Sequence, residues 1–134
     1  MGRKVGAVLL GTIVAFLVIA AVQMVSAIFY PVPEGLMKDK AAMAAHIARL
    51  PVTAFLFVLA AYALGTVAGV ATATRVGRSV VPGYIVGALL LIATLVNLTM
   101  FPHPAWFWVA SIAVVAGATF GMTRTAPPAV AQAA

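Results

Sequence analysis

Four long apolar runs limit what this 134-residue chain can fold into. A helix needs about 20 mainly apolar residues to cross the hydrocarbon core of a bilayer. The runs cover residues 5–30, 52–74, 80–101 and 105–123, and none alternates between apolar and polar residues as a half-buried strand does. The sequence therefore predicts an all-α, polytopic membrane protein built as a four-transmembrane-helix bundle.

The composition favours lipid rather than water as the solvent of most of the surface. Hydrophobic residues make up 65% of the chain and charged residues 7%, whereas a typical soluble domain has about 25% charged residues. A soluble domain of this size could not bury so many apolar side chains. We expect one transmembrane domain over residues 1–124 and a disordered cytoplasmic tail over residues 125–134, which lack an apolar period.

The first apolar run has a second interpretation. Arg3 and Lys4 precede it, and Val25-Ser26-Ala27 near its end resembles a signal-peptide cleavage site. However, its apolar part is longer than the roughly 7–15 residues of a usual signal core. We therefore expect an uncleaved helix, with a cleaved signal peptide as the alternative.

The basic residues predict an orientation, because Lys and Arg are enriched in short cytoplasmic loops. Arg3, Lys4, Arg75, Arg78 and Arg124 would share one side of the membrane, and the other side has fewer basic residues in a longer loop. Both termini are therefore expected in the cytoplasm. The net charge of +6 comes from scattered residues rather than a basic stripe, so nucleic acid is not an expected partner.

The first loop contains a pattern typical of a short amphipathic helix. Asp39 can cap its N-terminus, and Met43, Ile47 and Leu50 recur at i, i+4 and i+7. We expect this helix to lie on the outer membrane surface. An ordered loop without a helix is the alternative.

Small residues at four-residue spacing predict how the helices pack. In lipid, such residues let helix backbones approach closely. The predicted helix-packing residues are Gly65, Gly69, Gly83, Gly87, Gly117 and Gly121. They fall in the cytoplasmic half of the predicted bundle, and most aromatic residues fall at the outer end. A ridge that the bundle does not use, on the second or fourth long helix, would dock a neighbour.

Two similar corners predict an arrangement of two hairpins. Tyr30-Pro31-Val32-Pro33 ends the first long helix, and Phe101-Pro102-His103-Pro104 ends the third. Each aromatic-Pro-x-Pro corner leads to a helix with a Gly-xxx-Gly ridge. The alternative is convergence, because proline stops helices at membrane exits in any case.

The spans lack ionisable residues at their centres. Proton-coupled transport usually needs a titrating group at membrane depth, and intramembrane metalloprotease chemistry needs His and carboxylate ligands. Cysteine is absent, which excludes thiolate catalysis and Cys-ligated metals. His46, His103 and the nearby methionines could suit Cu(I), but no pair has a recognised spacing. We therefore predict no enzyme activity, no catalytic residue, no metal site and no cofactor.

A few polar or amphipathic residues within or beside the spans are candidates for ligand binding: Gln23, Tyr62, Asn97, His103 and Trp106. The alternatives are hydrogen bonds between helices for the amides, a turn for His103 and an interfacial belt for the aromatic residues. Threonines such as Thr66 and Thr94 are expected to bond their own helix backbone and to carry no function.

The order of motifs adds a resemblance. Pro31-x-Pro33-x-Gly35, Arg49-Leu50-Pro51, Arg75-Val76-Gly77-Arg78 and the run from Asn97 to Trp106-Phe107-Trp108 follow one another along residues 5–124. In this the chain resembles a group of uncharacterised small four-helix bacterial inner-membrane proteins without assigned activity. The resemblance implies a bacterial cytoplasmic membrane and a four-helix fold, but no site residues.

Two functions follow as expectations. The first is a non-enzymatic accessory or interaction subunit that packs through its glycine ridges, as a homo-oligomer or within a larger membrane complex. The second is a transporter or binding protein for a small apolar or amphipathic ligand, held in a cavity open to the outer leaflet. A cavity at Gln23 and Asn97 would favour the second.

Overall fold

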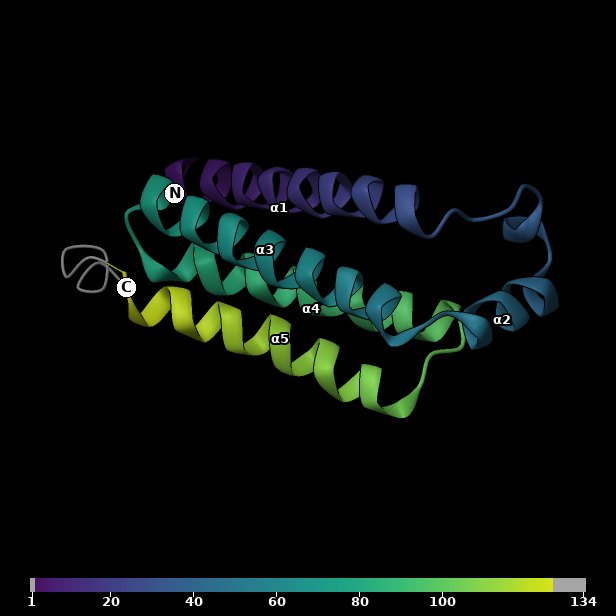
Figure 1. The fold of residues 1–134 in the computed structure, drawn as a ribbon. Coiled ribbons are helices and arrows are strands. Elements are labelled where there is room, and N and C mark those ends of the chain that lie inside the picture. The colour runs from purple at the N-terminus through teal and green to yellow at the C-terminus, as the bar shows by residue number, and fades with distance from the viewer. Residues whose placement is uncertain (1, 127–134) are drawn as a thin grey trace.

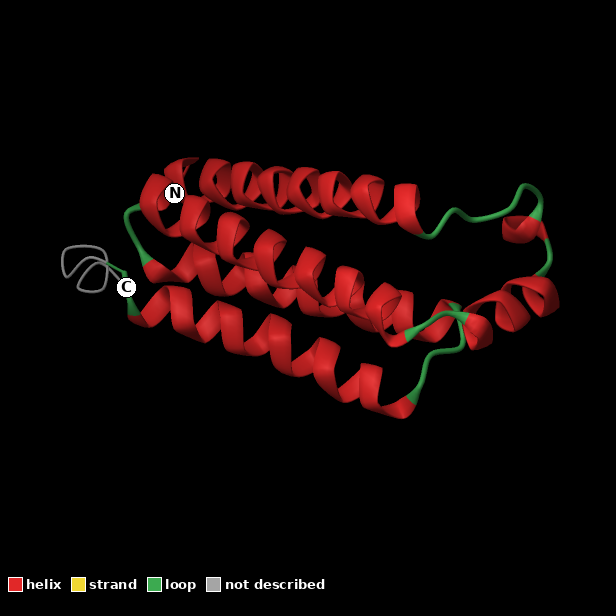
Figure 2. Ribbon diagram, viewed as in Figure 1, coloured by secondary structure: helices red, strands yellow, loops and turns green. Residues whose placement is uncertain are grey.

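A computed structural model of the chain describes residues 2–126, apart from the side chain of Met37. Its elements, in chain order, are α1 (Gly2–Phe29), η1 (Leu36–Lys38), α2 (Lys40–Arg49), α3 (Val52–Gly77), α4 (Val80–Met100) and α5 (Ala105–Arg124). All regular secondary structure in this part of the chain is helical (Figure 2). Residues 127–134 of the predicted tail lie outside the described residues.

Four of these helices, α1, α3, α4 and α5, are long and apolar enough to cross a membrane, which confirms the predicted number of spans. Together they are typical of a multi-pass membrane protein. Two boundaries lie three residues beyond the predicted ones, because helix geometry continues past the apolar residues, and the others agree to within one residue. α1 begins at Gly2 and includes Arg3 and Lys4, and α3 continues to Gly77.

The α3–α4 connection is a tight turn with a cap on each side. Arg78 ends α3 in the left-handed region, with φ 51°, and its amide donates to the carbonyl of Arg75. Ser79 caps the N-terminus of α4, and its hydroxyl accepts from the amide of Val81 at 3.2 Å. The turn therefore satisfies backbone groups at both helix ends with a single connecting dipeptide.

α3 is the central helix of the bundle. It contacts α1 most extensively and also contacts α4 and α5, whereas α1 touches α4 over a shorter stretch. Figure 1 shows the two termini at one end of the bundle and α2 at the opposite end. Three helices thus surround α3, which is also the most buried of the four.

The α1–α3 contact depends on small residues. A β-carbon at Gly11 would lie 2.6 Å from the carbonyl oxygen of Gly69, and one at Gly69 would lie 2.7 Å from that of Gly11. A β-carbon at Gly65 would lie 3.0 Å from the carbonyl oxygen of Ala15. The backbones are therefore so close that no larger residue fits without moving a helix.

The glycines of α4 and α5 differ from each other. A β-carbon at Gly83 would lie 2.5 Å from the Thr74 methyl group, and one at Gly87 would overlap Thr119. Around Gly117 and Gly121, no atom lies within 4 Å of such a carbon. The predicted packing glycines of α3 and α4 thus lie against neighbouring helices, whereas those of α5 face outward.

α2 lies beyond the end of the bundle opposite the termini (Figure 1). Asp39 caps it, accepting from the amides of Ala41 and Ala42 at 3.0 and 3.2 Å. Met43 is buried, and Ile47 and Leu50 are half-buried beside the core. The apolar residues that the sequence pattern identified therefore contact the bundle itself.

Candidate functional site

The candidate ligand-binding residues divide between two cavities. The first, called the central cavity here, has a volume of about 210 Å³. All four long helices contribute to it: Phe16, Ile19, Gln23, Tyr62, Thr66, Leu90, Ala93, Thr94, Asn97 and Val115. It brings together Gln23, Tyr62 and Asn97, whereas His103 and Trp106 line a different cavity.

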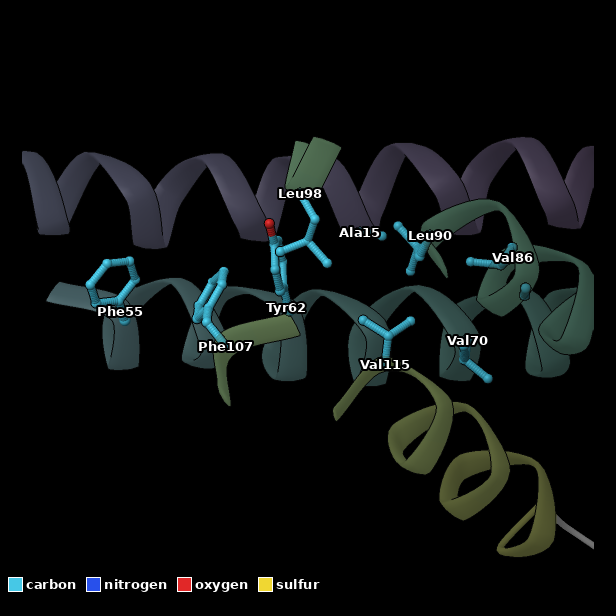
Figure 3. Close-up of a cluster of buried hydrophobic side chains, with 10 residues drawn as sticks. Ala15, Phe55, Tyr62, Val70, Val86, Leu90, Leu98, Phe107 and Val115 are labelled. Atoms are coloured by element: carbon cyan, nitrogen blue, oxygen red, sulfur yellow. The ribbon is translucent and has the colours of Figure 1, made fainter. Parts of the chain in front are cut away.

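A hydrogen bond joins two of the candidate residues across the helices. The Asn97 side-chain amide of α4 donates to the Tyr62 hydroxyl of α3 at 2.8 Å. Figure 3 shows the Tyr62 ring extending from α3 toward α1, with its hydroxyl at the far end. Because this oxygen accepts from Asn97, its own hydrogen remains available for another acceptor.

Thr66 differs from Thr94, the other threonine of the central cavity. Its hydroxyl is buried without a hydrogen-bond partner, and the side chain is 1% exposed. Thr94, which lines the same cavity, donates to the carbonyl of Leu90 at 2.8 Å, and Thr72 and Thr119 donate to their own helices in the same way. Thr66 was expected to do likewise, so this expectation was wrong.

No sequence signal separates Thr66 from the other threonines, because helix backbone carbonyls are offered to all of them. Within residues 2–126, Thr12 and Ser111 are also buried without a partner, but they do not line the central cavity. Thr66 thus lines the central cavity and carries a buried hydroxyl that no group of the chain satisfies. Such a group costs free energy unless water or a ligand bonds to it.

The central cavity is uncharged. In the described part of the chain, its lining includes no Asp, Glu, Lys, Arg or His. The polar groups present are amides and hydroxyls, which can donate and accept hydrogen bonds but do not balance a charge. The arrangement can therefore orient a polar, neutral group and offers no acid–base pair.

The opening of the central cavity lies between α1 and α4. Phe16 of α1 is 47% exposed, and Gln23, Ala93 and Asn97 are half-buried. The lining residues of α3 and α5 are buried. Because the exposed and half-buried lining residues belong to α1 and α4, the cavity reaches the side of the bundle between these two helices.

His103 and Trp106 border the second cavity, of about 330 Å³, between α2 and the α4–α5 corner. The Nδ1 atom of His103 lies 2.8 Å from the carbonyl oxygen of Phe101. The imidazole also stacks on Phe107, with ring centroids 5.0 Å apart. These contacts fix the histidine within the corner, away from the central cavity.

Metal ligands do not gather within residues 2–126: no group of three or more His, Cys, Asp or Glu side chains is placed to hold an ion there. Comparison with known proteins adds no assignment. No family model, curated protein or solved structure matches this chain.

Proposed function

We propose that this chain is a non-enzymatic membrane subunit that binds a neighbouring transmembrane helix through the outward face of α5. The observation that carries the proposal is the open space around Gly117 and Gly121. With Ala113, which is also exposed, they leave a strip of small residues along α5. A strip of this kind allows the close backbone approach that drives helix association in lipid.

The other glycine ridges support this interpretation. A neighbouring helix of the same chain occupies the space beside each of the other ridge glycines: Gly11, Gly65, Gly69, Gly83 and Gly87. Gly6 is also open, but it lies near the N-terminus of α1, two residues after Lys4. The strip on α5 is therefore the unused ridge that reaches the middle of a span, from Gly121 in the last turn to Ala113.

The membrane setting is part of the same proposal. The resemblance of the motifs supports a bacterial cytoplasmic membrane, and the distribution of basic residues supports both termini in the cytoplasm and α2 at the outer surface. In this orientation α1–α3 and α4–α5 would form two hairpins, and Lys38, Lys40 and Arg49 would meet the outer headgroups. The partner is a second copy of the chain or a subunit of a larger membrane complex.

Blue-native electrophoresis in mild detergent, combined with native mass spectrometry, tests the proposal. Gly117→Ile should shift the native complex to the monomer, because a branched side chain separates the helices. Ala88→Ile is the matched control, since Ala88 is exposed on α4 away from the strip. A wild-type chain that runs only as a monomer, or a complex unchanged by Gly117→Ile, would contradict the proposal.

The absence of cysteine allows a second readout of the same face. Gly117→Cys should form a disulfide-linked dimer in oxidised membranes if the partner is a second copy. Ala88→Cys should not. A complex seen by native mass spectrometry without such a crosslink would instead identify a different subunit by its mass.

A further inference from the structure

We propose that the central cavity binds an uncharged amphipathic molecule from the lipid phase, through a hydroxyl or carbonyl oxygen that bonds to Thr66 and Tyr62. This inference goes beyond the proposed helix-docking function and is independent of it, because the α5 strip forms no part of the cavity lining.

The unsatisfied hydroxyl of Thr66 is the first observation that points to a ligand. A helical threonine normally bonds a carbonyl of its own helix, as Thr94 does across the same cavity. Thr66 does not, although it is 1% exposed. It is therefore buried at a cost that a bound oxygen would remove.

The Tyr62–Asn97 pair is the second, independent observation. Tyr62 and Thr66 are four residues apart and so lie on one face of α3. Asn97 occupies the acceptor side of the Tyr62 hydroxyl, with its nitrogen 2.8 Å away, so the phenolic hydrogen is free to donate. Two hydroxyls on one helix face can thus serve the polar end of one ligand.

The rest of the lining sets the class of that ligand. Phe16, Ile19, Leu90, Ala93 and Val115 are apolar and favour an apolar body. A charged group would lose its hydration without gaining a counter-charge. The volume of about 210 Å³ exceeds the roughly 150 Å³ of an engineered cavity that holds benzene, so one small chain or ring fits.

The position of the cavity opening determines how a ligand enters. It lies between α1 and α4, two helices long and apolar enough to span a membrane, beside the exposed Phe16 ring. A molecule dissolved in the hydrocarbon would therefore reach the cavity sideways. The same chemistry occurs in a free small alcohol and in an uncharged lipid headgroup such as that of a diacylglycerol.

Photolabelling of the full chain in lipid nanodiscs tests the inference, with a diazirine-bearing octanol as the probe. Peptide mass spectrometry should place saturable label on lining residues such as Gln23 and Ala93. Octan-1-ol should compete, whereas octane and octanoate should not, since the first lacks the oxygen and the second carries a charge. Stronger competition by dioctanoylglycerol than by octan-1-ol would identify a lipid headgroup as the ligand, and the reverse a small alcohol.

Two isosteric variants distinguish binding through the Thr66 hydroxyl from nonspecific partitioning into an apolar cavity. Thr66→Val should weaken competition by octan-1-ol about fivefold, the size of one lost hydrogen bond. Thr94→Val should leave it unchanged, because that hydroxyl already donates to Leu90. Three outcomes would each overturn the inference. Octane could compete as well as octan-1-ol, or Thr66→Val could leave the competition unchanged. The third is the absence of saturable label, which would mean that water alone fills the cavity. Native masses and proteolytic digestion patterns that match those of the wild type confirm that the variants fold.

Discussion

Gly11 of α1 and Gly69 of α3 face each other so closely that a β-carbon on either would lie within 2.7 Å of the other's carbonyl oxygen. The contact is reciprocal and involves backbone on both sides, so no side-chain rotation can relieve it. It anchors the most extensive helix contact of the bundle. It also leaves α1 pressed against α3 beside the central cavity, to which α1 contributes Gln23.

Gly69→Ala should therefore destabilise the bundle. The added methyl group forces α1 and α3 apart, and overpacking of this kind costs about 1–3 kcal/mol. Reversible unfolding in mixed micelles, titrated with sodium dodecyl sulfate, should show a lower midpoint. Gly6→Ala is the control, because its β-carbon meets no atom within 4 Å, and it should unfold at or above the wild-type midpoint. A Gly69→Ala midpoint equal to that of the control would refute the close contact.

The bond between Tyr62 and Asn97 should appear as coupling in a double-mutant cycle. Tyr62→Phe and Asn97→Leu each remove one partner of the 2.8 Å bond. Hydrogen bonds between helices in lipid contribute about 0.6 kcal/mol on average, with a maximum of about 1.7 kcal/mol. We expect a coupling energy in this range from the same unfolding titrations.

Tyr84 provides the control cycle for that experiment. It lies on α4 with Asn97, but it is exposed and stacks edge-on against Phe120, with ring centroids 6.0 Å apart. Tyr84→Phe combined with Asn97→Leu should give no coupling within error. Equal coupling in both cycles would mean that the energy reflects general loosening of the bundle.

The sequence predicted the spans well because hydropathy and length decide whether a helix can cross a bilayer. Asp39 was also predictable, because a short polar side chain before an apolar period satisfies the first amides of a helix. The central position of α3 was not. Helical periodicity shows that small residues share a face, but it does not show which neighbour covers that face.

The same limit applies to the candidate site. Gln23, Tyr62 and Asn97 were identifiable as polar groups within spans, and they do line one cavity. His103 and Trp106 were grouped with them as residues of the outer end, but the structure places both at the α4–α5 corner, where they line a different cavity with α2. Thr66 was missed, because its sequence context resembles that of Thr94 and only the three-dimensional structure shows which hydroxyl is left without a partner.

The cap of α2 yields a further prediction. Asp39 accepts two backbone amides, and replacing such a cap by alanine costs about 0.5–2 kcal/mol. Asp39→Ala should therefore speed amide hydrogen exchange in residues 40–43, while Asp39→Asn should preserve the wild-type rate because its amide oxygen can cap as well. Faster exchange in both variants would assign the effect to the lost charge instead of the cap.

Arg78 offers the last test, since it is the one non-glycine residue with positive φ among residues 2–126. The left-handed conformation costs an L-residue roughly 1–2 kcal/mol, whereas glycine adopts it freely. Arg78→Gly and Arg78→Ala remove the same charge from the α3–α4 turn, so any effect on membrane orientation is shared. Arg78→Gly should nevertheless be the more stable of the two by about 1 kcal/mol, because glycine relieves the strain but gives the unfolded chain more freedom. Paired unfolding titrations check the difference, and an alanine variant as stable as the glycine variant would show that the turn changes conformation to accommodate it.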